Sequence, residues 1–234
     1  MNLSKIITKN KKAALVVLID PDKFNPELID LVSKSKTAFF LVGGSGLKKN
    51  NISSVVSQIK KRSKKPVLIF PGDEKQICKN ADGLLLLSLI SGRNPEFLIG
   101  KHVKAVPSIK KNKLETLSVG YILMHGDRTS TTQKVTGTDA ISSVKEATDT
   151  AIAGELLGLK AIYLEAGSGA KTQVNTKVIH TVKKNITVPL FVGGGIDSAA
   201  KAKAAIKAGA NFVVVGNALE KNLYLLSEIE KAFV

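Results

Sequence analysis

Acidic side chains directly follow or end two apolar segments of this chain, where buried strands are expected to end. Asp20 follows residues 13–19, and Glu165 ends the segment 159–165. Because side chains alternate along a strand, Tyr163 and Glu165 point to the same side. Burying an unpaired carboxylate is costly, so a carboxylate in such a place indicates chemistry rather than core packing. Glu165 suits a general base that takes a proton from an alcohol, with Tyr163 as a hydrogen-bond donor beside it.

Asp20 is also a candidate metal ligand. Asp20 and Asp22 bracket a proline. Two carboxylates this close suit a hard cation such as Mg²⁺, which uses few protein ligands together with waters and substrate phosphates. Ser45, in the glycine-rich turn 43–46, can add a hydroxyl oxygen to the same ion. Asp22 has an alternative role, because an aspartate here can cap the following helix or form a turn. We therefore expect Mg²⁺ as the cofactor.

Besides the turn 43–46, glycine-containing turns follow three more of the expected strands. Glycine lets the backbone N–H groups of a turn approach an anion closely, and the N-terminus of the next helix adds partial positive charge. Two such turns side by side form a cup for phosphate. The alternative is that these glycines only turn the chain. The residues concerned are Gly167, Ser168 and Gly169, then Gly194 and Gly195, and finally Gly216 and Asn217.

The elements that must position these residues are eight apolar segments, most of them followed by a helical pattern. This alternation predicts an α/β fold, a modified (β/α)8 TIM barrel that forms a single domain over residues 1–234, with the active site at the carboxyl ends of the strands. The link 74–81 is too short for a full helix, so we expect the third helix to be short or missing. We expect the strands at 13–19, 37–42, 65–70, 82–88, 118–124, 159–165, 188–192 and within 209–217.

The remaining elements are expected on the same pattern. Residues 125–138 read as a long polar loop, and a helical segment follows from about 139 to 157. A single last helix is expected over 218–233. His125 ends a strand, and we favour a loop hydrogen bond for it over a role in catalysis or substrate contact. His102 and His180 fall within helical patterns and are expected to be structural.

Composition narrows the class of protein. The single cysteine, Cys78, excludes an internal disulfide framework, and residues 1–12 lack the apolar region of a signal peptide, so we expect a cytoplasmic protein. No apolar run is long enough to cross a bilayer. The net charge of +16 comes mainly from lysines scattered over helical segments, which is typical of solvated helix faces. With no tryptophan and 5% aromatic residues, we expect no nucleic-acid partner, while weak attraction to anionic lipid stays open.

Six motifs, in order along almost the whole chain, resemble the geranylgeranylglyceryl phosphate synthase family, which includes bacterial heptaprenylglyceryl phosphate synthases. The aspartate-rich opening combined with the sequence around Glu165 is the most specific part of the resemblance. The motifs are Leu-Ile-Asp-Pro-Asp-Lys at 18–23, Val-Gly-Gly-Ser-Gly at 42–46, Phe-Pro-Gly at 70–72, Tyr-Leu-Glu-Ala-Gly-Ser-Gly at 163–169, Phe-Val-Gly-Gly-Gly-Ile-Asp at 191–197 and Val-Gly-Asn at 215–217.

The resemblance implies a Mg²⁺-dependent prenyltransferase of the family's second group. Such an enzyme joins the hydroxyl of sn-glycerol 1-phosphate to a polyprenyl diphosphate, here geranylgeranyl diphosphate, in an ether bond and releases diphosphate. It also implies a homo-oligomer, either a dimer or a hexamer. By the same resemblance Asp20 and Ser45 hold Mg²⁺, and Glu165 with Tyr163 is catalytic. The substrate contacts are expected from Lys23, Tyr163, Leu164, Glu165, Ala166, Gly167, Ser168, Gly169, Gly194, Gly195, Gly216 and Asn217.

Three alternatives stay open. A heptaprenyl-specific enzyme would differ only in the length of the prenyl tail. A phosphosugar enzyme would share the phosphate cup without needing an apolar trough, for which residues 84–90, Phe97, Leu98 and Tyr121 are the candidates here. A basic, non-catalytic module that binds lipid or nucleic acid would not depend on Asp20 or Glu165.

Overall fold

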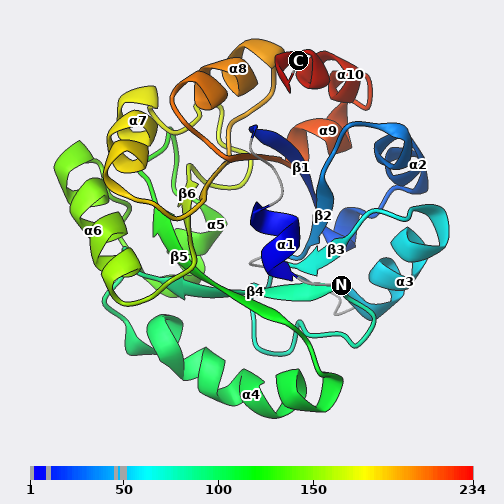
Figure 1. The fold of residues 1–234 in the computed structure, drawn as a ribbon, viewed down its shortest axis with the longest axis horizontal. Helices are drawn as coiled ribbons and strands as arrows, with labels where there is room; N and C mark the ends of the chain where they lie inside the picture. The colour runs from blue at the N-terminus through cyan, green and yellow to red at the C-terminus, as the bar shows by residue number, and fades with distance from the viewer. Residues whose placement is uncertain (1–2, 9–11, 45–46, 48–51, 234) are drawn as a thin grey trace.

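Eight parallel strands close into a barrel in the order β1 to β8, which confirms the predicted fold (Figure 1). The structure, a computed structural model, describes residues 3–8, 12–44, 47 and 52–233. Pairing of β1 with β8, with Val16 opposite Val214, closes the ring. The strands are β1 Ala14–Ile19, β2 Phe39–Val42, β3 Val67–Ile69, β4 Gly83–Leu89, β5 Thr116–Leu123, β6 Ala161–Glu165, β7 Leu190–Gly193 and β8 Phe212–Val215.

The strands form because their apolar, often β-branched residues are buried on both faces. Along β1, Val16 belongs to the cluster inside the barrel, whereas Leu15 and Val17 pack against the surrounding helices. Aromatic rings fill the inside of the barrel. The rings of Phe191 and Phe212 stack with their centroids 4.4 Å apart. These packed rings fill the inside of the barrel below the carboxyl ends of the strands.

Helices surround most of the barrel. Helix α2 illustrates how they begin, because the side chain of Asn25 accepts a hydrogen bond from the Glu27 N–H and Pro26 occupies the first turn. The structure describes all of the link 70–82 between β3 and β4, and none of its residues is helical. The predicted loss of the third barrel helix, which would connect β3 to β4, is therefore confirmed. The other main helices are α3 Ile52–Arg62, α4 Lys101–Asn112, α6 Val144–Leu156, α7 Thr176–Asn185 and α8 Ala199–Lys207, with α2 at Pro26–Lys34.

Three predicted segments were wrong in detail. The expected loop 125–138 contains a short helix, α5 (Thr131–Thr136), which Ser130 and Gln133 stabilise through a capping box. Helix α6 begins at Val144 rather than near residue 139, because residue 141 forms a β-bridge with Met124. The expected last helix is broken into α9 (Asn217–Lys221), α10 (Leu225–Glu230) and a 3-10 turn (Lys231–Phe233). The break lies at Asn222, whose backbone is extended.

A short helix that the sequence did not predict, α1 (Leu3–Thr8), covers the amino-terminal end of the barrel. Leu3 and Ile7 are buried in the cluster inside the barrel. The Leu3 N–H donates to Glu115 Oε2 at 2.8 Å, which ties α1 to the chain just before β5. In Figure 1 this helix lies over the centre of the ring of strands. It therefore closes the barrel at the end opposite to the strand carboxyl termini.

Helix α4 and the turn before it leave three apolar side chains in solvent. A π-helical turn (Glu96–Gly100) leads into α4, and Ile99, Val103 and Val106 are 60%, 64% and 45% exposed along its outer side. The inner side of the same helix contributes His102 and Ala105 to the wall of the main cavity. Within the part of the chain that the structure describes, no helix is both long and apolar enough to cross a membrane.

Candidate active site

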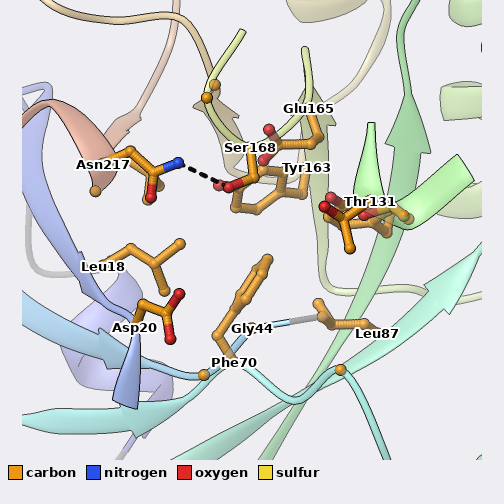
Figure 2. A pocket seen from close by; sticks show the side chains of 18 of the residues that line it. Leu18, Asp20, Gly44, Phe70, Leu87, Thr131, Tyr163, Glu165, Ser168 and Asn217 are labelled. Atoms are coloured by element: carbon orange, nitrogen blue, oxygen red, sulfur yellow. Dashed lines mark hydrogen bonds between the residues drawn. The ribbon is translucent and has the colours of Figure 1, made fainter. Parts of the chain in front are cut away.

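A cavity of about 790 Å³ opens at the carboxyl ends of the strands, where the sequence predicted the active site. Its polar end is formed by the turns after β1, β6, β7 and β8, and an apolar arm extends over β4. Figure 2 shows Glu165, Tyr163, Ser168 and Asn217 on one side of this cavity and Asp20 opposite Thr131. Residues far apart in the sequence thus converge on one space.

Glu165 lies at the end of β6 and lines the cavity although it is only 7% exposed. Its Oε1 accepts a hydrogen bond from the Gly167 N–H at 2.7 Å. Burial raises the pKa of this carboxyl from 4.5 to about 7. A carboxyl with such a pKa can accept a proton near neutral pH and is a stronger base than an ordinary glutamate. Gly194 leaves the space for it, because a Cβ there would lie 2.4 Å from Oε1.

Tyr163 also lines the cavity, as strand alternation predicted. Its ring stacks between those of Tyr121 and Phe191, with centroids 5.3 Å and 6.0 Å away. Burial, together with the nearby charge of Glu165, raises the pKa of the hydroxyl well above its usual value, so it stays protonated. The hydroxyl lies beside the Glu165 carboxyl, but it makes no hydrogen bond of good geometry to any described residue. A buried donor without a partner is rare in proteins and suits a group that a substrate will occupy.

The three turns of the predicted phosphate cup lie together at the ends of β6, β7 and β8, and phosphate binding there stays a prediction. Asn217 Nδ2 donates to Ser168 Oγ at 2.9 Å, which joins two of the three turns (Figure 2). Gly194 and Gly195 have φ values of 80° and 68°, a region that disfavours other residues. A Cβ on Gly195 would lie 2.1 Å from the Thr172 carbonyl oxygen. Glycine is therefore required for the shape of the cup.

Nine of the twelve predicted substrate contacts line the cavity, and three do not. The side chain of Leu164 points outward and, like Ala166, packs against the helices. The Gly167 N–H is already used by Glu165. The Ala166 N–H likewise donates to the Gly193 carbonyl, so substrate contacts by these three residues stay a prediction. The nine residues that line the cavity are Lys23, Tyr163, Glu165, Ser168, Gly169, Gly194, Gly195, Gly216 and Asn217.

A charged cluster occupies the β1 side of the cavity. Lys23 Nζ lies 3.0 Å from Glu220 Oε2, 3.3 Å from Asn217 Oδ1 and 3.5 Å from Asp20 Oδ2. Burial raises the pKa of Glu220, and contact with Lys23 opposes this shift. Sequence reasoning missed Glu220, because it lies on the short helix α9 outside any recognised motif. The link through Asn217 connects this cluster to the phosphate cup.

The residues present fit a bound Mg²⁺. Asp20 faces the cavity, and its Oδ1 accepts the Asp22 N–H at 3.0 Å, which fixes the carboxylate and leaves Oδ2 toward Lys23. Over the described ranges no three acidic, histidine or cysteine side chains are grouped so that they could hold a metal ion. One carboxylate suits Mg²⁺, which keeps waters and takes substrate phosphate oxygens. Ser45, the second predicted ligand, lies outside the described residues.

The apolar arm exists because the barrel helix between β3 and β4 is missing. Because no helix covers β4, Leu84 and Leu86 from its outer face line the cavity together with Leu87 and Leu89. Phe97 and Tyr121, both predicted, also contribute to the wall. The prediction was wrong for Ile90 and Leu98, which face a separate hollow beside α6. Such an arm can hold a hydrocarbon chain.

Further residues clarify roles that the sequence left open. His102 lines the cavity, and its Nε2 lies 2.9 Å from the Leu87 carbonyl oxygen, a contact consistent with the expected structural role. His125 is exposed, does not line the cavity, and uses its backbone N–H to bond the Ile141 carbonyl. Arg128 does line the cavity. The only signal for Arg128 in the sequence was its place in a polar loop after a strand.

Comparisons with known sequences agree with this geometry. A sequence model of the PcrB family matches residues 5–233. The geranylgeranylglyceryl phosphate synthase of Chitinophaga pinensis is 44% identical over 225 residues, which are 94% of this chain and 89% of that protein. The enzyme of the same name from Thermococcus kodakarensis is 38% identical over 221 residues, or 92% of this chain and 86% of that protein.

Solved structures show the same similarity. The structure of (S)-3-O-geranylgeranylglyceryl phosphate synthase from Thermoplasma acidophilum in complex with sn-glycerol-1-phosphate superposes with a TM-score of 0.93, at 28% identity, over 100% of this chain and 98% of that one. Thiamine phosphate pyrophosphorylase from Pyrococcus furiosus gives a TM-score of 0.59 at 13% identity, over 99% and 94% of the two chains, and shares the fold alone.

Proposed function

This chain belongs to the PcrB family, and from that premise we propose that it is a prenyltransferase acting on sn-glycerol 1-phosphate and a polyprenyl diphosphate. We take geranylgeranyl diphosphate as the donor. The observation that carries the proposal is the single cavity, which joins a glycine-rich polar end around Glu165 to an apolar arm over β4. A phosphosugar enzyme would use the polar end but would have no need of the arm.

The residues suggest how the reaction proceeds. The cup around Ser168 and Asn217 holds the phosphate of the acceptor, so that its hydroxyl reaches Glu165. As the bond between C1 of the donor and its diphosphate breaks, the hydroxyl oxygen bonds to C1, and Glu165 takes the hydroxyl proton. Diphosphate leaves with the electron pair. Tyr163 donates a hydrogen bond to an acceptor oxygen and helps to hold the two reactants in attack geometry.

We also propose that the reaction requires Mg²⁺. Asp20, with Ser45 as the second expected ligand, would hold the ion. When bound, the ion would neutralise charge on the diphosphate leaving group. Lys23, which already contacts both Asp20 and Glu220, would add positive charge on the same side of the cavity.

The test is an incubation of the protein with Mg²⁺, sn-glycerol 1-phosphate and geranylgeranyl diphosphate, followed by mass spectrometry of the lipid extract. A parallel tube contains sn-glycerol 3-phosphate. We expect an ether product in the first tube only, and no product after chelation of Mg²⁺ or in Glu165→Gln. Product with heptaprenyl diphosphate but not geranylgeranyl diphosphate would assign the longer tail, and no product with any donor would refute the proposal.

Where the protein works is proposed on the same basis. We place it in the cytoplasm as a homo-oligomer, either a dimer or a hexamer. Light scattering of the purified protein would distinguish the two oligomeric states.

We further propose that the exposed apolar residues Ile99, Val103 and Val106 touch the surface of an anionic membrane, where a prenyl donor partitions. The net charge of +16 supports this choice of lipid.

A further inference from the structure

Arginine is used sparingly in this chain. Of its 35 lysines and arginines, only three are arginines and the other 32 are lysines. Arg62 contacts both carboxylate oxygens of Asp30, at 3.2 Å and 2.9 Å. Arg93 donates to the carbonyls of Ile90 and Gly92. In both cases Nη1 of the guanidinium makes the two contacts, so each of these arginines already has acceptors within the protein.

Arg128, the third arginine, has no such acceptors. Across the described residues its guanidinium makes no hydrogen bond or ion pair, although its positive charge acts on the neighbouring Asp127. Its Nη2 lies against Gly169, where a Cβ would be only 2.9 Å away. The same Cβ would lie 3.3 Å from Asn217 Nδ2. Arg128 is therefore placed at the phosphate cup with its donors unused.

The loop that carries Arg128 is held firmly against the turn after β6. A Cβ on Gly126 would lie 2.6 Å from the Ala166 carbonyl oxygen, and a Cβ on Gly167 would lie 2.9 Å from Ser130 Cβ. These close contacts stand on either side of Arg128. The position of Arg128 beside Gly169 is thus set by packing on both sides.

A hydrogen-bonded aspartate adds to this support. Asp127 Oδ1 accepts the Lys171 N–H at 2.9 Å, which joins the loop to the segment after the cup. This bond and the positive charge of Arg128 lower the pKa of Asp127, the bond being the larger cause. Asp127 is consequently engaged with the backbone at Lys171 instead of pairing with Arg128.

We propose that Arg128 binds the phosphate of the acceptor, sn-glycerol 1-phosphate, through two parallel charge-assisted hydrogen bonds. Lys23, in contrast, is paired with Glu220 at 3.0 Å and stands on the β1 side of the cavity. Arg128 and Lys23, two of the cations that line the cavity, thus serve different anionic groups, with Arg128 at the acceptor phosphate and Lys23 toward the diphosphate of the donor. A bidentate guanidinium suits a terminal phosphate, which presents several equivalent oxygens. This inference rests on the proposed function.

The experiment is calorimetric titration of wild type, Arg128→Ala and Arg128→Lys with sn-glycerol 1-phosphate, with inorganic phosphate and with geranylgeranyl diphosphate. We expect Arg128→Ala to raise the Kd for sn-glycerol 1-phosphate and for inorganic phosphate about tenfold or more. Arg128→Lys should recover only part of this loss. The Kd for geranylgeranyl diphosphate should change less than about twofold.

The matched control is Arg62→Ala, because Arg62 contacts Asp30 and does not line the cavity. It should leave all three Kd values unchanged. Thermal unfolding should give Arg128→Ala the melting temperature of wild type, since the side chain has no partner in the described part of the protein. Equal affinity of wild type and Arg128→Ala for sn-glycerol 1-phosphate would overturn the inference alone. If wild type bound neither phosphate compound, both the inference and the proposed function would fall.

Discussion

At the scale of single residues, Glu165 combines two properties that ordinarily conflict. It is buried, which favours the neutral carboxyl, yet the proposed reaction needs its ionised form. The Gly167 N–H stabilises the ionised form only in part, so the pKa stays near 7. Burial in the barrel thus raises the free energy of the ionised carboxylate, which makes Glu165 a stronger base where a proton must be accepted.

This balance predicts the pH dependence of activity. The rate should rise with pH through about 7, as Glu165 loses its proton and becomes able to act as a base. Glu165→Gln should lower kcat by a factor of about 10² to 10⁴, the usual range for loss of a general base. The measurement is a pH profile of kcat for wild type and variant. A wild-type profile without a rise near 7 would contradict the assignment.

The same carboxyl predicts a change in stability with pH. Its pKa is raised in the folded protein, so its stabilising contribution is complete below about pH 4.5 and is lost as pH rises through about 7. Glu165→Gln should therefore be more stable than wild type at pH 8, by about 3 kcal/mol in free energy of unfolding. The difference should vanish near pH 4. Urea unfolding at both pH values measures it, and equal stability at pH 8 would argue against a buried ionised group.

Gly193 predicts a second effect at this scale. A Cβ on Gly193 would lie 2.1 Å from the Tyr163 hydroxyl oxygen, so Gly193→Ala must displace that ring. We expect kcat to fall at least about tenfold, because the hydroxyl leaves its place beside Glu165. Steady-state kinetics measures this fall. Tyr163→Phe is the matched comparison, and its loss of activity should not add to that of Gly193→Ala in the double variant.

At the scale of elements, the sequence predicted the strands well and the short helices poorly. Strands such as β1 and β8 are continuous apolar runs whose burial on both faces leaves few alternatives. Helix α1, of six residues, and helix α5, also of six, have no apolar face long enough to detect. Their position depends on contacts with distant residues, such as the bond from Leu3 to Glu115, which no local pattern contains.

The uncovered face of β4 leads to a prediction for donor binding. In a regular barrel, Leu86 would lie beneath the helix between β3 and β4, but here it lines the apolar arm. Leu86→Asn should raise KM for geranylgeranyl diphosphate about tenfold, because an amide without partners is costly to bury against a hydrocarbon chain. The Kd for sn-glycerol 1-phosphate should not change. Steady-state kinetics measures the KM for geranylgeranyl diphosphate, and calorimetry measures the Kd for sn-glycerol 1-phosphate. A raised Kd for sn-glycerol 1-phosphate with an unchanged KM for the donor would show that the arm does not hold the donor.

At the scale of the whole molecule, the proposed membrane contact can be tested with vesicles. Ile99, Val103 and Val106 changed together to Ser should reduce sedimentation with anionic vesicles at least about tenfold, since burial of these side chains drives binding. Leu156→Ser is the control, because Leu156 is 83% exposed but lies on α6. Binding by wild type should weaken at high salt. Equal sedimentation of the triple variant and wild type would refute the contact at α4.

The site as a whole was predictable where it depends on motifs and less so where it depends on assembly. Glu165, Ser168 and Asn217 each follow a strand, and parallel strands in a barrel end at one face, so their convergence could be foreseen. Arg128 and Glu220 enter through a loop and a short helix. Close packing against Gly169 places Arg128, and the ion pair with Lys23 places Glu220. Only the folded structure brings these residues together.

The closure of the ring has a consequence for synthesis. Strand β1 needs β8 as its second partner, and Val16 pairs with Val214. On the ribosome, therefore, one edge of β1 stays open until nearly the whole chain has emerged. Helix α1, which precedes all eight strands in the sequence, cannot dock before Glu115 has appeared. Contacts this distant in sequence slow folding, so α1 and β1 are among the last elements to complete their contacts although they emerge before the other strands.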